Sequence, residues 1–206
     1  MEHQSIIYSK LEQFIKKFYT NELLRGTIFF VGLGLLYFLF TLFVEYFLWL
    51  KPTARTILFW TFIAVELFLL LRFILFPIFK LLNLQKGIDF NDASKIIGNH
   101  FSEVGDKLTN FLQLSIDSDN QDKNSELLLA SIEQKASTLQ PIPFSNAINF
   151  GKNKKYLPLA IIPILFFLFF VISGQSDIIS QSFNRVVNYK QQFLPPAPFE
   201  FQVLNK

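Results

Sequence analysis

Three long apolar runs, separated by stretches of mixed polarity, dominate the pattern of hydrophobic positions along the chain. They lie within residues 23–50, 57–79 and 156–173 and are rich in Phe, Leu and Ile. A helix needs roughly 20 consecutive apolar residues to cross the hydrocarbon core of a bilayer, and each run is close to that length or longer. The pattern therefore predicts an all-α integral membrane protein with three transmembrane helices.

The first two runs are separated only by a short polar segment that contains Lys51 and Pro52. A connection this short forces the two helices to run antiparallel, so residues 23–80 are predicted to form a transmembrane helical hairpin. The third transmembrane helix is expected over residues 156–174.

Residues 1–22 predict a separate amphipathic N-terminal helix. Apolar residues recur at helical spacing from Ile7 to Phe18, with lysines among the polar positions between them. Thr20 or Asn21 would then cap the next helix. An amphipathic helix of this kind either lies at the membrane surface or packs on a partner, and the pattern leaves both arrangements open.

A polar insert, residues 81–155, lies between the second and third runs, and its acidic and basic side chains nearly balance. Three apolar stripes predict three helices, which begin after Asn91 or Asp92, after Asp106, and near Leu128. About a dozen large apolar side chains give such an insert only a thin core. We therefore expect a small cytoplasmic helical module that leans on the membrane helices or on another protein.

Two further elements are expected after the third run. Residues 175–193 carry apolar side chains at helical spacing and predict a periplasmic amphipathic helix. In residues 194–206, prolines stop the helix and the alternation from Phe199 to Leu204 predicts a β-strand. This strand would be the first of an extracytoplasmic β domain, so we expect the chain to be the membrane-proximal piece of a longer protein.

The distribution of Lys and Arg predicts the orientation. Basic residues gather before the first run, after the second and before the third, and with three spans these groups share one side of the membrane. The positive-inside rule assigns that side to the cytoplasm. We expect a multi-pass protein of the bacterial inner membrane, with a cytoplasmic N-terminus and a periplasmic C-terminus.

Composition narrows the chemistry further. The chain has no Cys, which excludes disulfides, thiolate metal sites and cysteine nucleophiles. Its net charge of +3 is spread along the chain, so nucleic acid is not an expected partner. Asp117, Asp119 and Asp122 lack the glycine that a calcium loop needs. We expect no catalytic residues, no cofactor and no metal, and therefore no enzyme. The expected partners are membrane lipids and other integral membrane proteins.

Ionisable residues inside the apolar runs are the candidate sites, since each costs roughly 2.5–3.5 kcal/mol at mid-bilayer on insertion scales. Glu66 lies near the middle of the second run, and Glu45 lies roughly 10 Å nearer the outer surface, which predicts two separate sites. Glu66 is either a proton-carrying or partner-contacting carboxylate, or a structural residue that ties helices together. Arg72 is expected to snorkel to the cytoplasmic boundary. We predict all three as helix or partner contacts.

Three stretches carry a resemblance to a known family, namely DASKIIGNHFSEVGDKLTNFLQLS, ELLLASIEQKASTLQPIPF and PPAPFEFQVLNK. Together they resemble the beginning of a family of very large Bacteroidetes inner-membrane proteins of unknown function. The resemblance implies a protein that continues into a long periplasmic region opening with immunoglobulin-like β structure. It implies no functional residues, because the stretches are helix-packing strings and not catalytic motifs.

Two functions fit these features. The first is the membrane anchor and docking portion of a large envelope protein, acting as a subunit of an inner-membrane multiprotein complex in protein export or envelope biogenesis. The protein-export machinery is a candidate partner. The alternative is a transporter or ion-coupled subunit that uses Glu66 and Arg72. Three helices per chain are few for a transport pathway, so the first function is favoured. An enzyme in an exported continuation is a third possibility that this sequence does not address.

Overall fold

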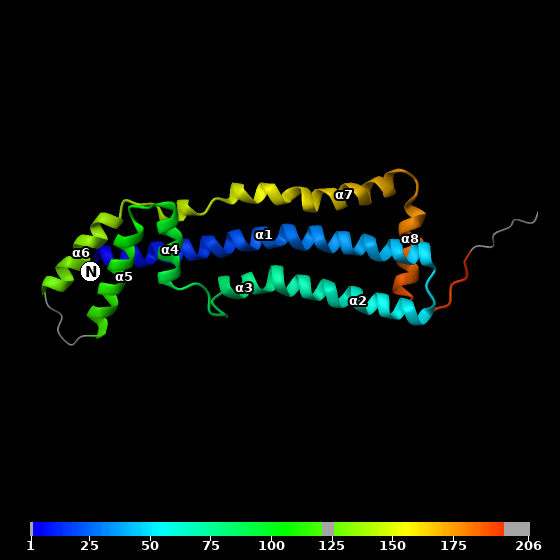
Figure 1. Cartoon of the computed structure of the whole chain (residues 1–206), viewed down its shortest axis with the longest axis horizontal. Coiled ribbons are helices and arrows are strands. Elements are labelled where there is room, and N and C mark those ends of the chain that lie inside the picture. Colours follow the sequence, from blue (N-terminus) through cyan, green and yellow to red (C-terminus); the bar gives the residue numbers. More distant parts are fainter. Residues whose placement is uncertain (1, 121–125, 196–206) are drawn as a thin grey trace, which may run out of the picture. The chain divides into compact units, whose positions relative to one another are not determined.

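The computed structural model describes residues 2–120 and 126–195, and every regular element in those residues is a helix. The elements, shown in Figure 1, are α1 (Glu2–Leu48), α2 (Pro52–Leu70), a π-helical turn (Leu71–Leu75), α3 (Phe76–Leu81), α4 (Phe90–His100), α5 (Gly105–Asn120), α6 (Glu126–Leu139), two 3₁₀ segments (Phe144–Ala147 and Phe150–Tyr156), α7 (Leu157–Ile172) and α8 (Ser176–Val187). The predicted strand in 194–206 lies outside the described residues from 196 onward, so the β domain stays a prediction.

Three helical segments are long and apolar enough to cross a membrane, namely His3–Leu48, Pro52–Leu81 and Phe144–Ile172. This confirms that the three predicted segments are helices long and apolar enough to span a membrane. In the second segment the π-helical turn joins α2 to α3 just before Pro77. Proline has no N–H to donate to the preceding turn, and a local π adjustment lets the helix continue past it.

The predicted break between an N-terminal helix and the first span is wrong, because α1 is one continuous helix over Glu2–Leu48. Neither expected cap acts as one. Thr20 donates its hydroxyl to the Lys16 carbonyl one turn earlier, at 2.9 Å, and the Asn21 side chain accepts a hydrogen bond from Asn153 at 2.8 Å. Residues 2–25 contain no glycine or proline, and the glycine that follows, Gly26, is tolerated within the helix.

The chain divides into two compact units. The helical module comprises the described parts of Met1–Gly26 and Ile74–Lys155. The membrane unit comprises the described parts of Thr27–Phe73 and Tyr156–Lys206. Helix α1 contributes its first part to the helical module and the remainder to the membrane unit.

The core of the helical module forms where α4, α5 and α6 pack with the N-terminal part of α1. Ile7, Leu11 and Phe14 of α1 are fully buried there. Their neighbours in the core include Ile97 of α4, Leu108 and Phe111 of α5, and Ile132 and Leu139 of α6. The amphipathic N-terminal residues therefore pack on the insert of their own chain, and they complete a core that the insert alone would leave thin.

Helix α4 begins slightly earlier than predicted. Its N-cap is Asp89, whose carboxylate accepts a hydrogen bond from the Asp92 N–H at 2.7 Å. The predicted start after Asn91 or Asp92 is therefore late by roughly two-thirds of a turn. Helices α4 and α5 then approach closely. A Cβ built on Gly98 would lie 2.7 Å from the Cα of Gly105, so only glycine allows this approach.

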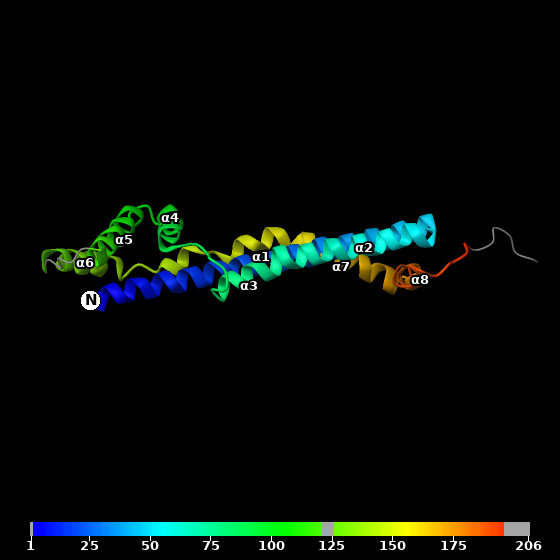
Figure 2. The ribbon, with the colours of Figure 1, turned by 90° about the horizontal axis from the view of Figure 1, so that it is seen from below.

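In the membrane unit, α1 lies between α2 and α7 (Figure 1), and the three helices overlap in the turned view (Figure 2). Two glycines of α1 face opposite neighbours. A Cβ on Gly32 would lie 2.7 Å from the Leu159 carbonyl oxygen of α7, whereas a Cβ on Gly34 would lie 2.9 Å from a carboxylate oxygen of Glu66 on α2. Residues two apart on a helix differ by roughly 200° in direction, which explains why each glycine serves a different neighbour.

Helix α8 follows α7 after a turn at Gly174, which has a positive φ of 74°. The helix packs on both α7 and α2. Its buried residues are Ser182, Arg185 and Val186. The predicted helix in residues 175–193 thus exists, and its buried face carries a charge that connects it to the other helices.

Candidate functional site

Glu45 is fully buried in the membrane unit, and two arginines converge on its carboxylate. Arg55 of α2 donates from Nε to Glu45 Oε1 at 3.0 Å, and its Nη2 lies 2.9 Å from the same oxygen. Arg185 of α8 places its Nε 3.3 Å from that oxygen. The side chains of Glu45 and Arg55 are 0% exposed and that of Arg185 is 4% exposed. We call these three residues the Glu45 cluster.

Arg55 also holds two backbone carbonyls. Its Nη2 donates to the Leu50 carbonyl at 2.7 Å in the turn between α1 and α2. Its Nη1 donates to the Gln191 carbonyl at 2.8 Å in the segment after α8. The guanidinium also lies 5.0 Å from the ring centroid of Phe193. A planar guanidinium with five donors can serve all these acceptors at once, which an ammonium on a flexible stem does less well.

Arg185 completes the cluster from α8. Its guanidinium lies over the Trp49 ring, 4.0 Å from the centroid. Trp49 has a positive φ of 43°, a strained conformation for a bulky residue that the surrounding contacts hold in place. Burial lowers the pKa of Arg185, and the Glu45 carboxylate opposes this shift. Because an arginine pKa is so high, the residue still carries its charge at neutral pH.

Glu45 is among the residues predicted from the sequence as candidate sites, but neither of its partners is. Glu45 lies about one helical turn before the end of α1, and Arg55 about one turn after the start of α2. In an antiparallel hairpin these positions come to the same level, so the Glu45–Arg55 pair could have been found from the sequence. Arg185 gave no comparable signal, because its position depends on the paths of α7 and α8.

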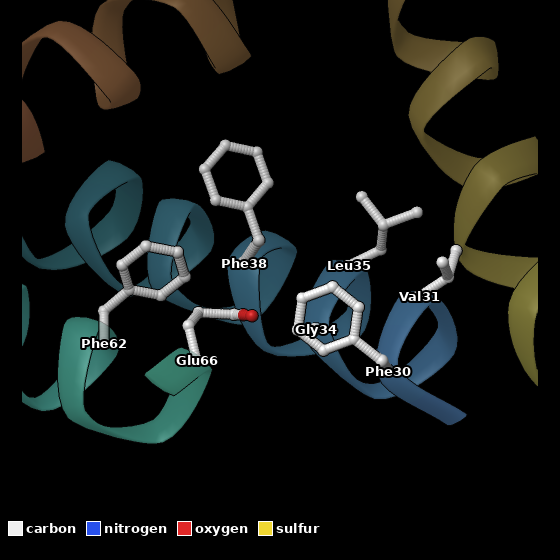
Figure 3. Close-up of a pocket in the computed structure, with 7 residues that line it drawn as sticks. All are labelled: Phe30, Val31, Gly34, Leu35, Phe38, Phe62 and Glu66. Atoms are coloured by element: carbon white, nitrogen blue, oxygen red, sulfur yellow. The ribbon is translucent and has the colours of Figure 1, made fainter. Parts of the chain in front are cut away.

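Glu66 lies in a separate hollow between α1 and α2 (Figure 3). The hollow has a volume of about 430 Å³, and its other lining residues are Phe30, Val31, Gly34, Leu35, Phe38 and Phe62. Figure 3 shows the Glu66 side chain pointing toward α1, with the rings of Phe62 and Phe30 on either side of it and the ring of Phe38 above. Its Oε1 is buried and has no hydrogen-bond partner among the described residues. A single carboxyl group therefore faces an otherwise apolar space.

Arg72 does not join either site. It is exposed, and its guanidinium lies 5.9 Å from the ring centroid of the adjacent Phe73. Arg72 lies six residues after Glu66, which is not the three- or four-residue spacing that brings two side chains together on one helix face. The structure thus places Glu45 with two arginines, leaves Glu66 without one, and keeps Arg72 apart from both.

The described residues contain no group of three or more side chains that could together hold a metal ion. His100 at the end of α4 packs edge-on against the ring of Phe101, with 4.6 Å between the centroids. Comparison of the chain with models of known protein families, with curated proteins and with solved structures found no match.

Proposed function

We propose that this chain is the membrane anchor and docking portion of a large envelope protein, and that it acts as a subunit of an inner-membrane multiprotein complex in protein export or envelope biogenesis. The observation that carries the proposal is the Glu45 cluster. It connects α1, α2 and α8 through one buried carboxylate, and Arg55 extends the connection to the Gln191 carbonyl. An anchor needs a fixed point of this kind, because a region joined by a loose linker would move freely relative to its membrane helices.

The energetics of the cluster agree with an anchoring role. Removing one partner of a buried ion pair costs about 3–5 kcal/mol, because the remaining charge is left without compensation. If α8 left the hairpin, Arg185 would lose its contacts with Glu45 and Trp49, and Arg55 would lose the Gln191 carbonyl. An amphipathic helix that only rested on lipid headgroups would need no buried charges, since its polar face would stay in water.

The docking part of the proposal rests on the helical module. The module has its own packed core, which α1 completes, and the lysines that predict the orientation assign it to the cytoplasm. In this orientation α8 and the segment after it lie on the periplasmic side. The chain then offers folded surfaces on both sides of the membrane to other subunits.

Cysteine labelling tests the orientation, because the chain has no Cys of its own. Leu127 in the helical module is 84% exposed, and Leu194 in the membrane unit is 79% exposed. After permeabilisation of the outer membrane, a membrane-impermeant maleimide should label Leu194→Cys in cells with an intact inner membrane. Leu127→Cys should be labelled only after lysis. Equal labelling of both before lysis would contradict the proposed topology.

Purification tests the complex. The full-length protein should be isolated from its native membranes in a mild detergent, and stoichiometric membrane-protein partners should accompany it. Arg55→Met, which breaks the anchoring cluster, should reduce their recovery, whereas Arg72→Met, at an exposed site, should not. Recovery of the wild-type protein alone would contradict a role as a complex subunit.

The alternative is a transporter or ion-coupled subunit that uses Glu66 and Arg72. The carboxyl group of Glu66, without a partner in its hollow, favours this reading, while its six-residue spacing from Arg72 counts against a joint site. The variant Glu66→Gln distinguishes the two functions. If it leaves the complex assembled but abolishes a proton-coupled or transport phenotype, the alternative is correct.

A further inference from the structure

One face of α1 in the membrane unit is left open by its neighbours. Helices α2 and α7 lie on opposite sides of α1 (Figure 1). The hollow around Glu66 lies on this open face (Figure 3). A second hollow of about 380 Å³ shares Phe38 with the first and is otherwise lined by Phe167, Val171, Ser176, Ile179, Ser180 and Phe183. The two hollows therefore follow one another along α1 toward α8.

The position of Glu66 on this face requires a partner. At roughly 1.5 Å per residue, Glu66 lies about 21 Å along the helix from Pro52, near the middle of the 30-residue segment Pro52–Leu81. Its Oε1 is buried without a hydrogen bond from any described residue. The hydrocarbon core supplies no water to satisfy it, and lipid tails have no donor to offer. A group other than the described residues must therefore supply the hydrogen bond.

The local packing holds the Glu66 carboxylate in place. The missing side chain of Gly34 leaves room for it, since a Cβ there would lie 2.9 Å from Oε2 and 3.4 Å from Oε1. The rings of Phe38 and Phe62 pack against each other beside it, with 5.8 Å between their centroids. The carboxyl group therefore stays on the α1 side of α2 and faces the open hollow.

We propose that this face receives a transmembrane helix from another protein, which places a neutral hydrogen-bond donor opposite Glu66. The proposal rests on the proposed role as a complex subunit and names the site of one subunit contact. A helix fits because the opening is elongated along α1, and because a spanning segment must satisfy its own backbone groups. A neutral donor fits because a hydrogen-bonded carboxyl group in hydrocarbon avoids the desolvation of a buried ion pair.

Site-specific photocrosslinking in native membranes tests the contact. The photoreactive residue benzoylphenylalanine should be incorporated in the full-length protein at the position of Phe38, which lines both hollows. The matched control is the position of Phe40, which is 55% exposed and lines neither hollow. We expect a discrete protein adduct from position 38 and none from position 40. Mass spectrometry of the adduct should identify a transmembrane segment with an Asn, Gln, Ser, Thr or Tyr near the crosslink.

Two variants then test the role of Glu66 in the position-38 background. Glu66→Leu removes the hydrogen bond and should lower the adduct yield about fivefold, as expected for one interhelical hydrogen bond in a membrane. Glu66→Gln keeps a similar shape and hydrogen-bonding capacity and should stay within about twofold of the parent protein. Equal losses in both variants would overturn the assignment, because they would indicate a charged partner or a folding defect.

Three other crosslinking results would also contradict the proposed contact. An adduct with a second copy of this chain, an adduct with lipid alone, or an adduct indifferent to Glu66→Leu would each overturn the proposal. If stoichiometric partners still co-purify in that case, the subunit contact lies elsewhere and the proposed function stands. If the wild-type protein purifies alone, the proposed function itself fails.

Discussion

Replacing Arg55 with Met tests whether the Glu45 cluster holds the membrane unit together. Methionine keeps much of the volume of the side chain but removes its charge and all its donors. Glu45 would lose its two closest contacts, at 3.0 and 2.9 Å, and the carbonyls of Leu50 and Gln191 would lose their hydrogen bonds. Arg185 still faces the carboxylate from 3.3 Å, but Glu45 loses its hydrogen bonds from Arg55 and two buried carbonyls lose a donor, so we expect a cost of about 3–5 kcal/mol.

Arg185→Met provides the matched comparison at the same carboxylate. Its Nε lies 3.3 Å from Glu45 Oε1, without hydrogen-bond geometry, and its guanidinium lies over Trp49. Removing it leaves one carboxylate with one arginine, so the remaining charges are balanced. The loss is then mainly a cation–π contact of about 0.5–2 kcal/mol, partly offset by relief of the repulsion from Arg55. We expect Arg185→Met to cost about 1–2 kcal/mol, clearly less than Arg55→Met.

The two tryptophans of the chain make a local assay possible. Trp60 is 57% exposed, so a Trp60→Phe background should leave Trp49 as the one fluorophore, directly beside Arg185. Unfolding by SDS in mixed micelles can be followed by Trp49 emission and by far-ultraviolet circular dichroism. Arg72→Met, at an exposed position, is the control and should shift the free energy of unfolding by less than about 0.5 kcal/mol.

Two results would refute this reasoning. The first is an Arg55→Met variant whose free energy of unfolding lies within about 1 kcal/mol of wild type, since a buried pair cannot be broken so cheaply. The second is an Arg185→Met variant that costs as much as Arg55→Met, which would mean that the excess positive charge is compensated by another group. Adding both Glu45→Leu and Arg185→Met to Arg55→Met should recover part of the stability, because no unpaired buried charge then remains.

Three further substitutions test the close contacts of the fold. Gly32→Ala should lower the free energy of unfolding in SDS by about 1–3 kcal/mol, because the added Cβ meets the Leu159 backbone. Gly34→Ala should lower it less, because its Cβ meets only the flexible end of the Glu66 side chain. Gly98→Ala should lower the free energy of unfolding of the helical module by about 1–3 kcal/mol, because α4 and α5 must separate at Gly105. Hydrogen exchange of the backbone amides in both helices measures this effect, and unchanged exchange would contradict it. Tyr19→Phe removes the hydroxyl that accepts the Ile88 N–H at 2.7 Å and should cost about 1 kcal/mol, measured as faster exchange of that amide.

The elements that depend on local pattern were predictable from the sequence. Three apolar runs of the right length gave the three membrane-crossing helices, and apolar stripes gave α4, α5, α6 and α8. The error at Thr20 and Asn21 has a simple cause. Residues that can cap a helix can also bond within it or across to another segment, and here Thr20 bonds to Lys16 and Asn21 to Asn153. Composition alone does not distinguish a cap from these alternatives.

The sequence identifies the candidate site residues, but it does not show which of them lie close together in the structure. Glu45, Glu66 and Arg72 stand out because ionisable groups are rare in apolar runs. Which charges meet depends on tertiary structure. The pairing of Glu45 with Arg55 follows from the symmetry of a tight hairpin, but the approach of Arg185 requires the third span to return α8 to the hairpin. The hollow beside Glu66 likewise depends on α2 and α7 lying on opposite sides of α1.

The two glutamates of the hairpin differ in their surroundings. Glu45 helps to hold the membrane unit together, whereas Glu66 faces an open hollow. Both are carboxylates on helices of the same hairpin, so the sequence gives them equal weight. Glu45 is buried and contacts two arginines of its own chain. Another protein could contact this carboxylate only by displacing those arginines. Glu66 has room around it, a glycine opposite it and no donor among the described residues. An unsatisfied buried carboxyl group is destabilising, so a hydrogen-bond donor placed in the open hollow beside Glu66 would stabilise the membrane unit.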